Sequence, residues 1–259
     1  MARPKALVVR AAGTNCDDET AYAFELCGAR STITAQLPLL EHPEMLKDYQ
    51  ILALPGGFSY GDDIAAGRVW ALEMIHHAGE EVLDLVRRGG VVMGICNGFQ
   101  VLVQMGLLPG IEHPMGEREV ALTDNEIPVY TDRWVHLEVE TDHCVFLERG
   151  EPLHLPLAHA EGKLVPRDDA LLQRIDELGR VALRYVGPDG ERRPQWPHNP
   201  NGSTDAVAGL TDETGRIFGL MPHPERHMFP FQHPNWTRRG LDEVPDGLRL
   251  FQNGVRAVQ

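Results

Sequence analysis

The chain has few cysteines, and none of them is arranged as a pair. Its 259 residues include only Cys16, Cys27, Cys96 and Cys144, with no CxxC motif. Cysteines so few and so scattered exclude a disulfide framework, and free thiols fit a reducing compartment. The zinc-binding motif HExxH is also missing, and no metal site is predicted.

Long apolar runs and an excess of basic residues are absent as well. No apolar stretch approaches membrane-spanning length, and the first residues, MARPKALVVR, lead into a predicted strand without the apolar core of a signal peptide. We therefore expect a cytoplasmic protein with no membrane partner. The formal net charge is −14, from 24 Lys and Arg against 38 Asp and Glu. This charge repels phosphate groups and argues against a nucleic-acid partner.

The sequence shows no internal repeat, no low-complexity tract and no interdomain linker. These absences favour a single domain over residues 1–259, with a C-terminal extension over about residues 229–259. With 42% hydrophobic residues the chain is long enough to bury a large core. The phosphate-binding motif GxxxxGK[ST] is missing, so neither an ATP site nor any cofactor is expected in this chain.

The first half of the chain contains a repeated strand and helix pattern. Short apolar runs alternate with segments of helical spacing, which predicts an α/β fold with an open, mostly parallel sheet and helices on both faces. Ligands are expected beyond the carboxyl ends of its strands. The predicted segments are strands at 5–10, 31–37, 51–54 and 91–95, helices at 19–28 and 68–88, and polar connecting or helical sequence at 39–49.

The second half has the alternation that is typical of antiparallel strands at the edge of a sheet. Its prolines, glycines and asparagines mark one long irregular loop. The predicted segments are edge strands at 118–124 and 134–141, a loop leading into a strand at 158–165, further strands at 181–186, 206–210 and 217–221, the irregular loop at 187–204, and an amphipathic helix at 247–258.

The candidate nucleophile lies in the stretch GGVVMGICNGFQVLVQMGLLP, residues 89–109. An apolar run reaches Cys96 and changes there to helical spacing, the pattern of a strand, a sharp turn and a helix. Gly94 and Gly98 leave room for a strained turn of the nucleophile-elbow type. A cysteine at a helix N-terminus lies at the positive end of the helix dipole, which favours the thiolate. The alternative interpretation is a small buried core residue.

A cysteine nucleophile needs a base and a group that orients the base. His223 is the predicted base, because it follows an apolar strand and its backbone is fixed by Pro222 and Pro224. Glu225, two residues further on, is predicted to hold the imidazole and to stabilise its cationic form. An alternative interpretation is a metal site that joins His223 to His227, four residues away.

Backbone N–H groups near the candidate nucleophile are predicted to stabilise an oxyanion. The first predicted donor is the N–H of Asn97, directly after Cys96. The second is the N–H of Gly57, in the PGG turn that follows the strand at 51–54. Taken alone, PGG would indicate only a tight turn.

Six motifs together resemble one known family. They are GTNCDDE, PGGFSYGDD, GICNGFQ, AHAEGK, NPNGS and MPHPER, and the resemblance runs over about residues 5–227. The sequence is similar to the class I glutamine amidotransferases, which have a flavodoxin-like fold. Within that class it resembles the glutaminase subunits of phosphoribosylformylglycinamidine synthase. GxCxGxQ alone would indicate the class, whereas GICNGFQ with NPNGS and MPHPER points to the purine enzyme.

The resemblance implies a thioester mechanism. Cys96 would attack the side-chain amide of glutamine and release ammonia, and water would then hydrolyse the glutamyl thioester to glutamate. His223 and Glu225 would complete the catalytic triad, and the two backbone donors named above would hold the oxyanion.

The resemblance also implies roles for residues around the triad. Gly56, Phe58 and Gln100 would shape the glutamine pocket. His159 and Glu161, in AHAEGK, match a motif of the same subfamily. For this pair a role in an interface or in ammonia gating and a purely structural role are both open.

The implied partner is a synthetase subunit that receives ammonia through a protected passage. That subunit would use ATP and Mg to convert formylglycinamide ribonucleotide to the amidine in purine biosynthesis, commonly with a small third subunit.

Two features depart from the family pattern. The chain continues about thirty residues beyond MPHPER, and this tail is more like the end of the fused, single-chain form of the enzyme. One interpretation is that the tail packs on the synthetase. The loop at 187–205 is either a contact surface or a solvated connection.

Two other functions are alternatives to this one. The first is a cysteine-elbow hydrolase or stress protein without an ammonia partner, which does not explain why PGGFSYGD and MPHPER occur together. The second is a regulatory module that binds a partner and has lost catalysis. The presence of Cys96, His223 and Glu225 argues against that second function.

Overall fold

The computed structural model of the protein describes residues 3–62, 64–111, 115–150, 152–241 and 244–259. The strands are β1 Lys5–Arg10, β2 Arg30–Ala35, β3 Ile51–Leu54, β4 Val91–Ile95, β5 Val120–Asp124, β6 Thr131–Val139, β7 Leu153–His159, β8 Glu161–Pro166, β9 Val181–Val186, β10 Val207–Thr211 and β11 Ile217–Leu220. The α-helices are α1 Asp17–Leu26, α2 Gln36–Glu41, α3 Arg68–Arg87, α4 Asn97–Gln104, α5 Asp169–Glu177, α6 Trp236–Arg239 and α7 Asp246–Arg256. Short 3₁₀ turns are η1 Pro43–Asp48, η2 Ser59–Asp62, η3 Thr204–Ala206, η4 Pro224–Arg226 and η5 Pro230–Gln232.

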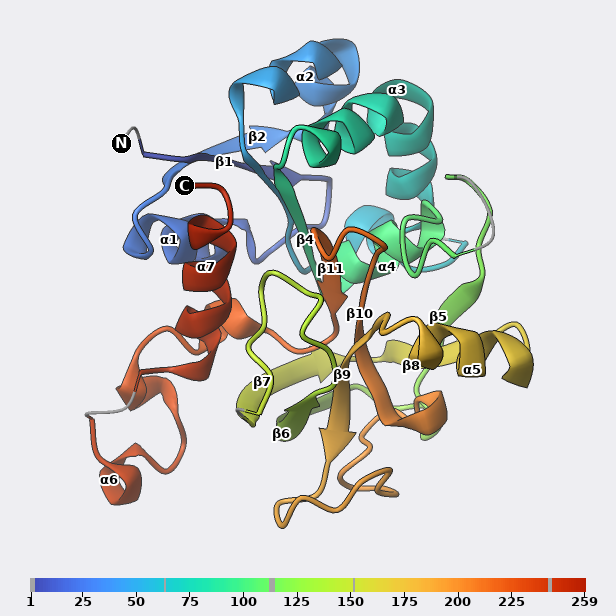
Figure 1. Cartoon of the computed structure of the whole chain (residues 1–259), viewed down its shortest axis with the longest axis vertical. Helices are drawn as coiled ribbons and strands as arrows, with labels where there is room; N and C mark the ends of the chain where they lie inside the picture. The colour runs from blue at the N-terminus through green and yellow to red at the C-terminus, as the bar shows by residue number, and fades with distance from the viewer. Residues whose placement is uncertain (1–2, 63, 112–114, 151, 242–243) are drawn as a thin grey trace.

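One mixed sheet runs through the molecule (Figure 1). Within the described residues it has nine strands in the order β2-β1-β3-β4-β11-β10-β9-β6-β7, while β5 and β8 form a separate antiparallel pair. The strands from β2 to β11 in this order are parallel, and those from β11 to β7 pair antiparallel. The predicted α/β class with a mostly parallel sheet and antiparallel edge strands is confirmed.

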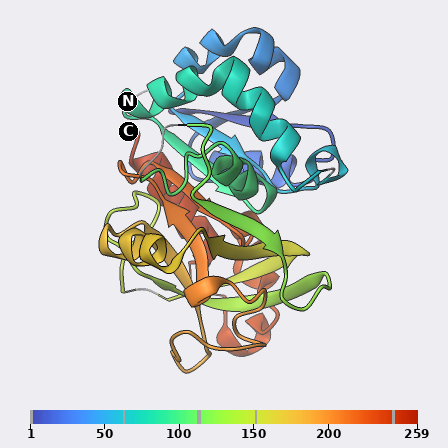
Figure 2. The same cartoon turned by 90° about the vertical axis from the view of Figure 1, so that its right-hand side faces the viewer.

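Helices cover both faces of the parallel half, as predicted. Helices α1 and α7 pack together on one face, and α2, α3 and α4 lie on the other (Figure 1). Figure 2 shows this helix-covered half above the antiparallel half. Every residue of β3 and β4 is buried, as expected for strands covered on both sides. Among the described residues, no helix combines the length and apolar character needed to cross a membrane.

The prediction of a loop at the start of segment 158–165 is wrong. Ala158 and His159 end strand β7, and β8 begins at Glu161 after a single intervening residue. Strand β7 is not among the predicted elements, and it contains Pro156, which cannot donate to a strand ladder. Since β7 is the last strand of the sheet, the missing donor costs no pairing, and the Pro156 carbonyl still accepts the backbone N–H of His223 at 2.7 Å.

The predicted strand at 31–37 is too long. Strand β2 ends at Ala35, and Gln36 begins helix α2. The Gln36 side chain turns inward to hydrogen-bond with Tyr60 and Glu73, contacts that no local pattern encodes. Helix α5 was not predicted at all, although Asp168 caps it by accepting the Leu171 N–H at 2.8 Å.

The C-terminal helix packs on its own chain. The predicted helix at 247–258 is present as α7, and its Phe251 ring meets Phe24 of α1 edge to face, with centroids 4.8 Å apart. Gly247 allows the helix to approach the turn η4 closely, because a Cβ there would lie 1.9 Å from the Pro224 carbonyl oxygen. This part of the extension therefore supports the segment that carries His223.

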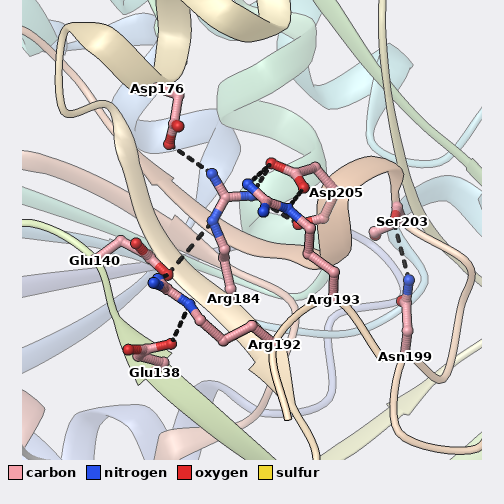
Figure 3. Close-up of polar contacts among 9 residues, drawn as sticks. All are labelled: Glu138, Glu140, Asp176, Arg184, Arg192, Arg193, Asn199, Ser203 and Asp205. Atoms are coloured by element: carbon pink, nitrogen blue, oxygen red, sulfur yellow. Dashed lines mark hydrogen bonds and ion pairs between the residues drawn. The ribbon is translucent and has the colours of Figure 1, made fainter. Parts of the chain in front are cut away.

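The loop at 187–205 is anchored to the sheet by a buried arginine (Figure 3). Arg184 of β9 is 3% exposed. Its guanidinium contacts three carboxylates, those of Glu140 at 3.4 Å, Asp176 at 2.5 Å and Asp205 at 2.5 Å. Two exposed loop arginines extend the network, Arg192 to Glu138 and Glu140 and Arg193 to Asp205. The loop is irregular, as predicted, but both of its ends are held in place.

Replacing Arg184 tests this anchor. We expect Arg184→Met, which keeps most of the side-chain volume, to lower the free energy of unfolding by about 3 kcal/mol, because three carboxylates lose their shared cation. Arg193→Met is the matched control, since this exposed arginine binds one of the same carboxylates and should cost less than about 1 kcal/mol. Urea denaturation measures both, and equal losses would contradict the assigned role.

Candidate active site

Cys96 occupies a strained turn between β4 and α4, as the sequence predicts. Its backbone has φ 51° and ψ −105°, a conformation that residues other than glycine rarely adopt. The two neighbouring glycines make the turn possible. A Cβ at Gly94 would lie 2.6 Å from the Gly98 carbonyl oxygen, and a Cβ at Gly98 would lie 1.8 Å from the Leu54 carbonyl oxygen. The elbow places Cys96 at the carboxyl end of β4, directly before the N-terminus of α4.

His223 and Glu225 lie at the carboxyl end of the neighbouring strand, β11. The Nδ1 atom of His223 is 2.6 Å from Oε1 of Glu225, and both side chains are buried. The carboxylate reaches the ring from the 3₁₀ turn η4. The other ring nitrogen, Nε2, has no hydrogen-bond partner in the described part of the chain and is left for a reacting group.

Charges around His223 favour its protonated form. Burial by itself lowers the pKa of the imidazole, but the Glu225 carboxylate opposes this effect, and the sulfur atoms of Cys96 and Cys16 act in the same direction as Glu225. The net result is a pKa well above the ordinary value for histidine. A buried imidazole next to a carboxylate is suited to accept a proton and to hold it.

A pocket of about 420 Å³, counted to its open mouth, joins most of the predicted site residues. Those that line it are Gly57, Phe58, Cys96, Gln100, His159, Glu161 and His223. They come from the loop after β3, the elbow, the turn between β7 and β8, and the turn after β11. Strand order in the sheet therefore brings together residues that are far apart in the chain.

The two predicted oxyanion donors differ in their position. Gly57 lines the pocket. The backbone on either side of Gly57 is bonded to residues 13–15, through the Phe58 N–H and the Gly56 carbonyl. Among the described residues the Gly57 N–H itself has no acceptor. The N–H of Asn97 belongs to the first turn of α4, where helix N–H groups have no partner within the helix. The Asn97 side chain does not line the pocket and instead accepts the Ser59 N–H at 3.1 Å.

Gly56, Phe58 and Gln100 lie at three different places around the pocket. Gly56 is behind the His223 ring, where a Cβ would come within 2.8 Å of Cε1. Phe58 is 43% exposed at the rim, with its ring centroid 6.3 Å from that of Tyr130. Gln100 is buried in the wall, and its Nε2 donates to the Glu161 carbonyl oxygen at 2.6 Å.

His159 and Glu161 both line the pocket beside Cys96 and His223. His159 is buried, and neither ring nitrogen has a hydrogen-bond partner among the residues that the structure describes. Burial, together with the charge of His223, lowers its pKa to about 3. This histidine is therefore neutral. Burial also raises the pKa of Glu161, helped by Asp124 and opposed by a backbone hydrogen bond.

Four further pocket residues with polar side chains are not predicted from the sequence. They are Asn15, Asp62, Tyr130 and Arg226. Three of them stand inside motifs of the resemblance, Asn15 in GTNCDDE, Asp62 in PGGFSYGDD and Arg226 in MPHPER, so the signal was present but unused. Tyr130 lies outside those motifs and had no such signal. Burial and the nearby Glu161 raise the pKa of Asp62 to about 6.

The alternative metal site joining His223 and His227 is not formed. Because residues 224–226 make a 3₁₀ turn, His227 faces away from the pocket and meets Trp134, with ring centroids 4.9 Å apart. Within the described residues, one group is close enough to share a metal ion, namely Cys16, His223 and Glu225. The Cys16 sulfur of this group already accepts a hydrogen bond from Arg226. A metal cation placed here would be repelled by the Arg226 guanidinium.

Comparison with known proteins identifies the family. The chain matches the CobB/CobQ-like glutamine amidotransferase domain over residues 3–258. It belongs to the glutamine amidotransferase family. This amidotransferase is 45% identical, over 258 residues, to the phosphoribosylformylglycinamidine synthase subunit PurQ of Dehalococcoides mccartyi, covering 99% of this chain and 98% of the relative. The subunit of the same name from Methanococcus maripaludis is 36% identical over 265 residues, covering 97% and 96%.

A solved structure gives the same result for this amidotransferase. A chain in the structure of PurLQS from Thermotoga maritima aligns with a TM-score of 0.74 and 32% identity over 100% of both chains. The resemblance read from the six sequence motifs is therefore confirmed, and the amidotransferase belongs to the PurQ type.

Proposed function

We propose that the protein is the glutaminase subunit of phosphoribosylformylglycinamidine synthase. The observation that carries this proposal is that Cys96, on a strained elbow, and His223 line one pocket, with Glu225 bound to the His223 ring. Full-length similarity to PurQ subunits supports the same function. The chain would act as one domain over residues 1–259, in the cytoplasm, and its extension at 229–259 would brace the segment that carries His223.

In the first half of the proposed reaction, the Cys96 sulfur attacks the side-chain carbonyl carbon of glutamine and its proton passes to Nε2 of His223. The N–H groups of Gly57 and Asn97 hold the oxyanion. Glu225 stabilises the imidazolium, which then gives the proton to the departing nitrogen. Ammonia leaves, and a glutamyl thioester remains on the sulfur.

In the second half, His223 removes a proton from water as the water attacks the thioester carbonyl carbon. The same two N–H groups hold the second oxyanion. When this intermediate collapses, the carbon–sulfur bond breaks, glutamate is released and the thiol of Cys96 regains a proton from His223. The chain needs no cofactor for these steps, because acyl transfer through a thiol involves no redox change.

The pocket wall and rim would connect this chemistry to a partner. Gly56, Phe58 and Gln100 would shape the glutamine site, and the neutral His159 with Glu161 would line an exit for ammonia or contact the partner. Tyr130 at the rim is 52% exposed beside Phe58. The partner would be a synthetase subunit of the PurL type, assisted by a small PurS-type subunit, and it would use ATP and Mg to make formylglycinamidine ribonucleotide.

Reconstitution of the complex tests this function. We expect the purified chain to release little glutamate from glutamine. Adding the synthetase and the small subunit with ATP, Mg and formylglycinamide ribonucleotide should raise the rate at least about tenfold, because closure by a partner completes such sites. Glutamate release and amidine formation are measured together. Equal rates with and without the partners would count against coupled function.

A further inference from the structure

The segment GTNC, residues 13–16, has no role in the mechanism above, yet it lies directly against the site. The Phe58 N–H donates to the Gly13 carbonyl at 2.9 Å, and the N–H groups of Asn15 and Cys16 both donate to the Gly56 carbonyl at 3.2 Å. These bonds fix the PGG turn from behind. The same segment delivers the Cys16 side chain to the far side of the His223 ring.

Cys16 is 1% exposed and makes three polar contacts. Its sulfur accepts a hydrogen bond from Nη2 of Arg226 at 3.1 Å, donates to Oδ1 of Asn15 at 3.1 Å, and lies 4.0 Å from Nδ1 of His223. Gly56 packs against Cε1 of the same ring. The imidazole is thus enclosed by the GTNC segment and the turn that this segment holds.

We infer that Cys16 is a positioning residue, which holds Arg226 at 3.8 Å from Glu225 and prevents a direct hydrogen bond between them, so that Glu225 stays paired with His223. This inference rests on the proposed function, and it deepens that function by assigning a role to a second cysteine. Cys16 does not touch the substrate or the reacting atoms in this scheme. It acts through the imidazole.

The distances show a competition for one carboxylate oxygen. Oε1 of Glu225 is 2.6 Å from Nδ1 of His223 and 3.8 Å from Nε of Arg226. With Nη2 bound to the Cys16 sulfur, the guanidinium stays at the longer distance. Without that sulfur, Arg226 can close on Glu225, because a guanidinium is a permanent cation that can bind a carboxylate through two N–H groups at once. His223 would then lose the group that orients it and supports its charge.

Kinetics of the reconstituted complex give the first test. Cys16→Ala should lower kcat for glutamine hydrolysis by about tenfold or more and leave KM within about twofold, as expected for a misplaced catalytic group. Cys16→Ser should recover kcat to within about threefold of wild type, because a hydroxyl can make the same two hydrogen bonds. The matched control is Cys144→Ala, which removes an equally buried thiol in the connection between β6 and β7 and should behave as wild type.

Alkylation of Cys96 gives a test that does not depend on turnover. Iodoacetamide, a small amide, is used on the full chain across a range of pH, and labelling of the Cys96 peptide is followed by mass spectrometry. A less stable imidazolium supports the thiolate less, so the alkylation midpoint in Cys16→Ala should move to higher pH by about one unit. Among the described residues, the charged or titratable groups that face the His223 ring are Cys16, Cys96, Glu225, Arg226, His159 and Tyr130. The variant changes only Cys16 among them.

The outcomes separate the inference from the function on which it rests. An unchanged kcat and midpoint in Cys16→Ala would overturn the role of Cys16, as would equal losses in Cys16→Ala and Cys144→Ala. If the wild-type complex hydrolyses no glutamine, the proposed function fails, and the alkylation midpoint still decides whether Cys16 acts on the Cys96–His223 pair.

Discussion

Cys96→Ala should abolish glutamine-dependent synthesis by the complex and leave ammonia-dependent synthesis intact. Because no other group can form the thioester, we expect glutamate release to fall at least about a thousandfold. Ammonium salt supplied to the same variant bypasses the glutaminase step, and amidine formation from this source should stay near wild type. The measurement is the rate of product formation with each nitrogen donor.

The control for this experiment is Cys144, the buried cysteine between β6 and β7, whose replacement by alanine should change neither rate. Cys96 is 5% exposed and packs within the core, so circular dichroism and gel filtration should show that Cys96→Ala is folded and still assembles. Glutamate release that survives in this variant would remove Cys96 from the mechanism and with it the proposed triad.

Gly98→Ala should damage both stability and catalysis. A methyl group at this position would lie 1.8 Å from the Leu54 carbonyl oxygen, so helix α4 must move away from the end of β3. Such overpacking against backbone should lower the free energy of unfolding by about 3 kcal/mol. The movement also separates the N–H of Asn97 from that of Gly57, and a displacement of this kind should lower kcat by about a hundredfold.

Gly79→Ala in α3 is the matched substitution. The added methyl group there would overlap the flexible end of Met115 and make an ordinary contact with the Met74 carbonyl oxygen at 3.7 Å, and alanine improves helix propensity. We expect little change in stability or rate. Urea denaturation and glutaminase assays on both variants check the comparison, and a Gly98→Ala protein with normal kcat would show that the close contact at the elbow does not serve catalysis.

Much of the fold follows from local sequence. The apolar runs of β3 and β4 and the helical spacing of α3 were recognisable because strands and helices bury different periodic patterns. Strand β7 and the start of helix α2 were missed for tertiary reasons. Pro156 is tolerated because β7 lies at an edge of the sheet. Gln36 begins helix α2, and its side chain then hydrogen-bonds with Tyr60 and Glu73.

The sequence by itself determined the elbow at Cys96. Gly94, Cys96 and Gly98 are close in the chain, and the strain that they accommodate is local, so their spacing predicts it. His223 with Glu225 is equally local, because two residues in one short turn share a hydrogen bond.

Only the tertiary structure decided which other groups meet these two segments. Strands β4 and β11 are neighbours although more than a hundred residues separate them, and their pairing places Cys96 and His223 over one pocket. The same packing brings Cys16 against Arg226 and His223. The physical reason is that strand order arises from burial and hydrogen bonding summed over the whole sheet, and no single segment carries that information.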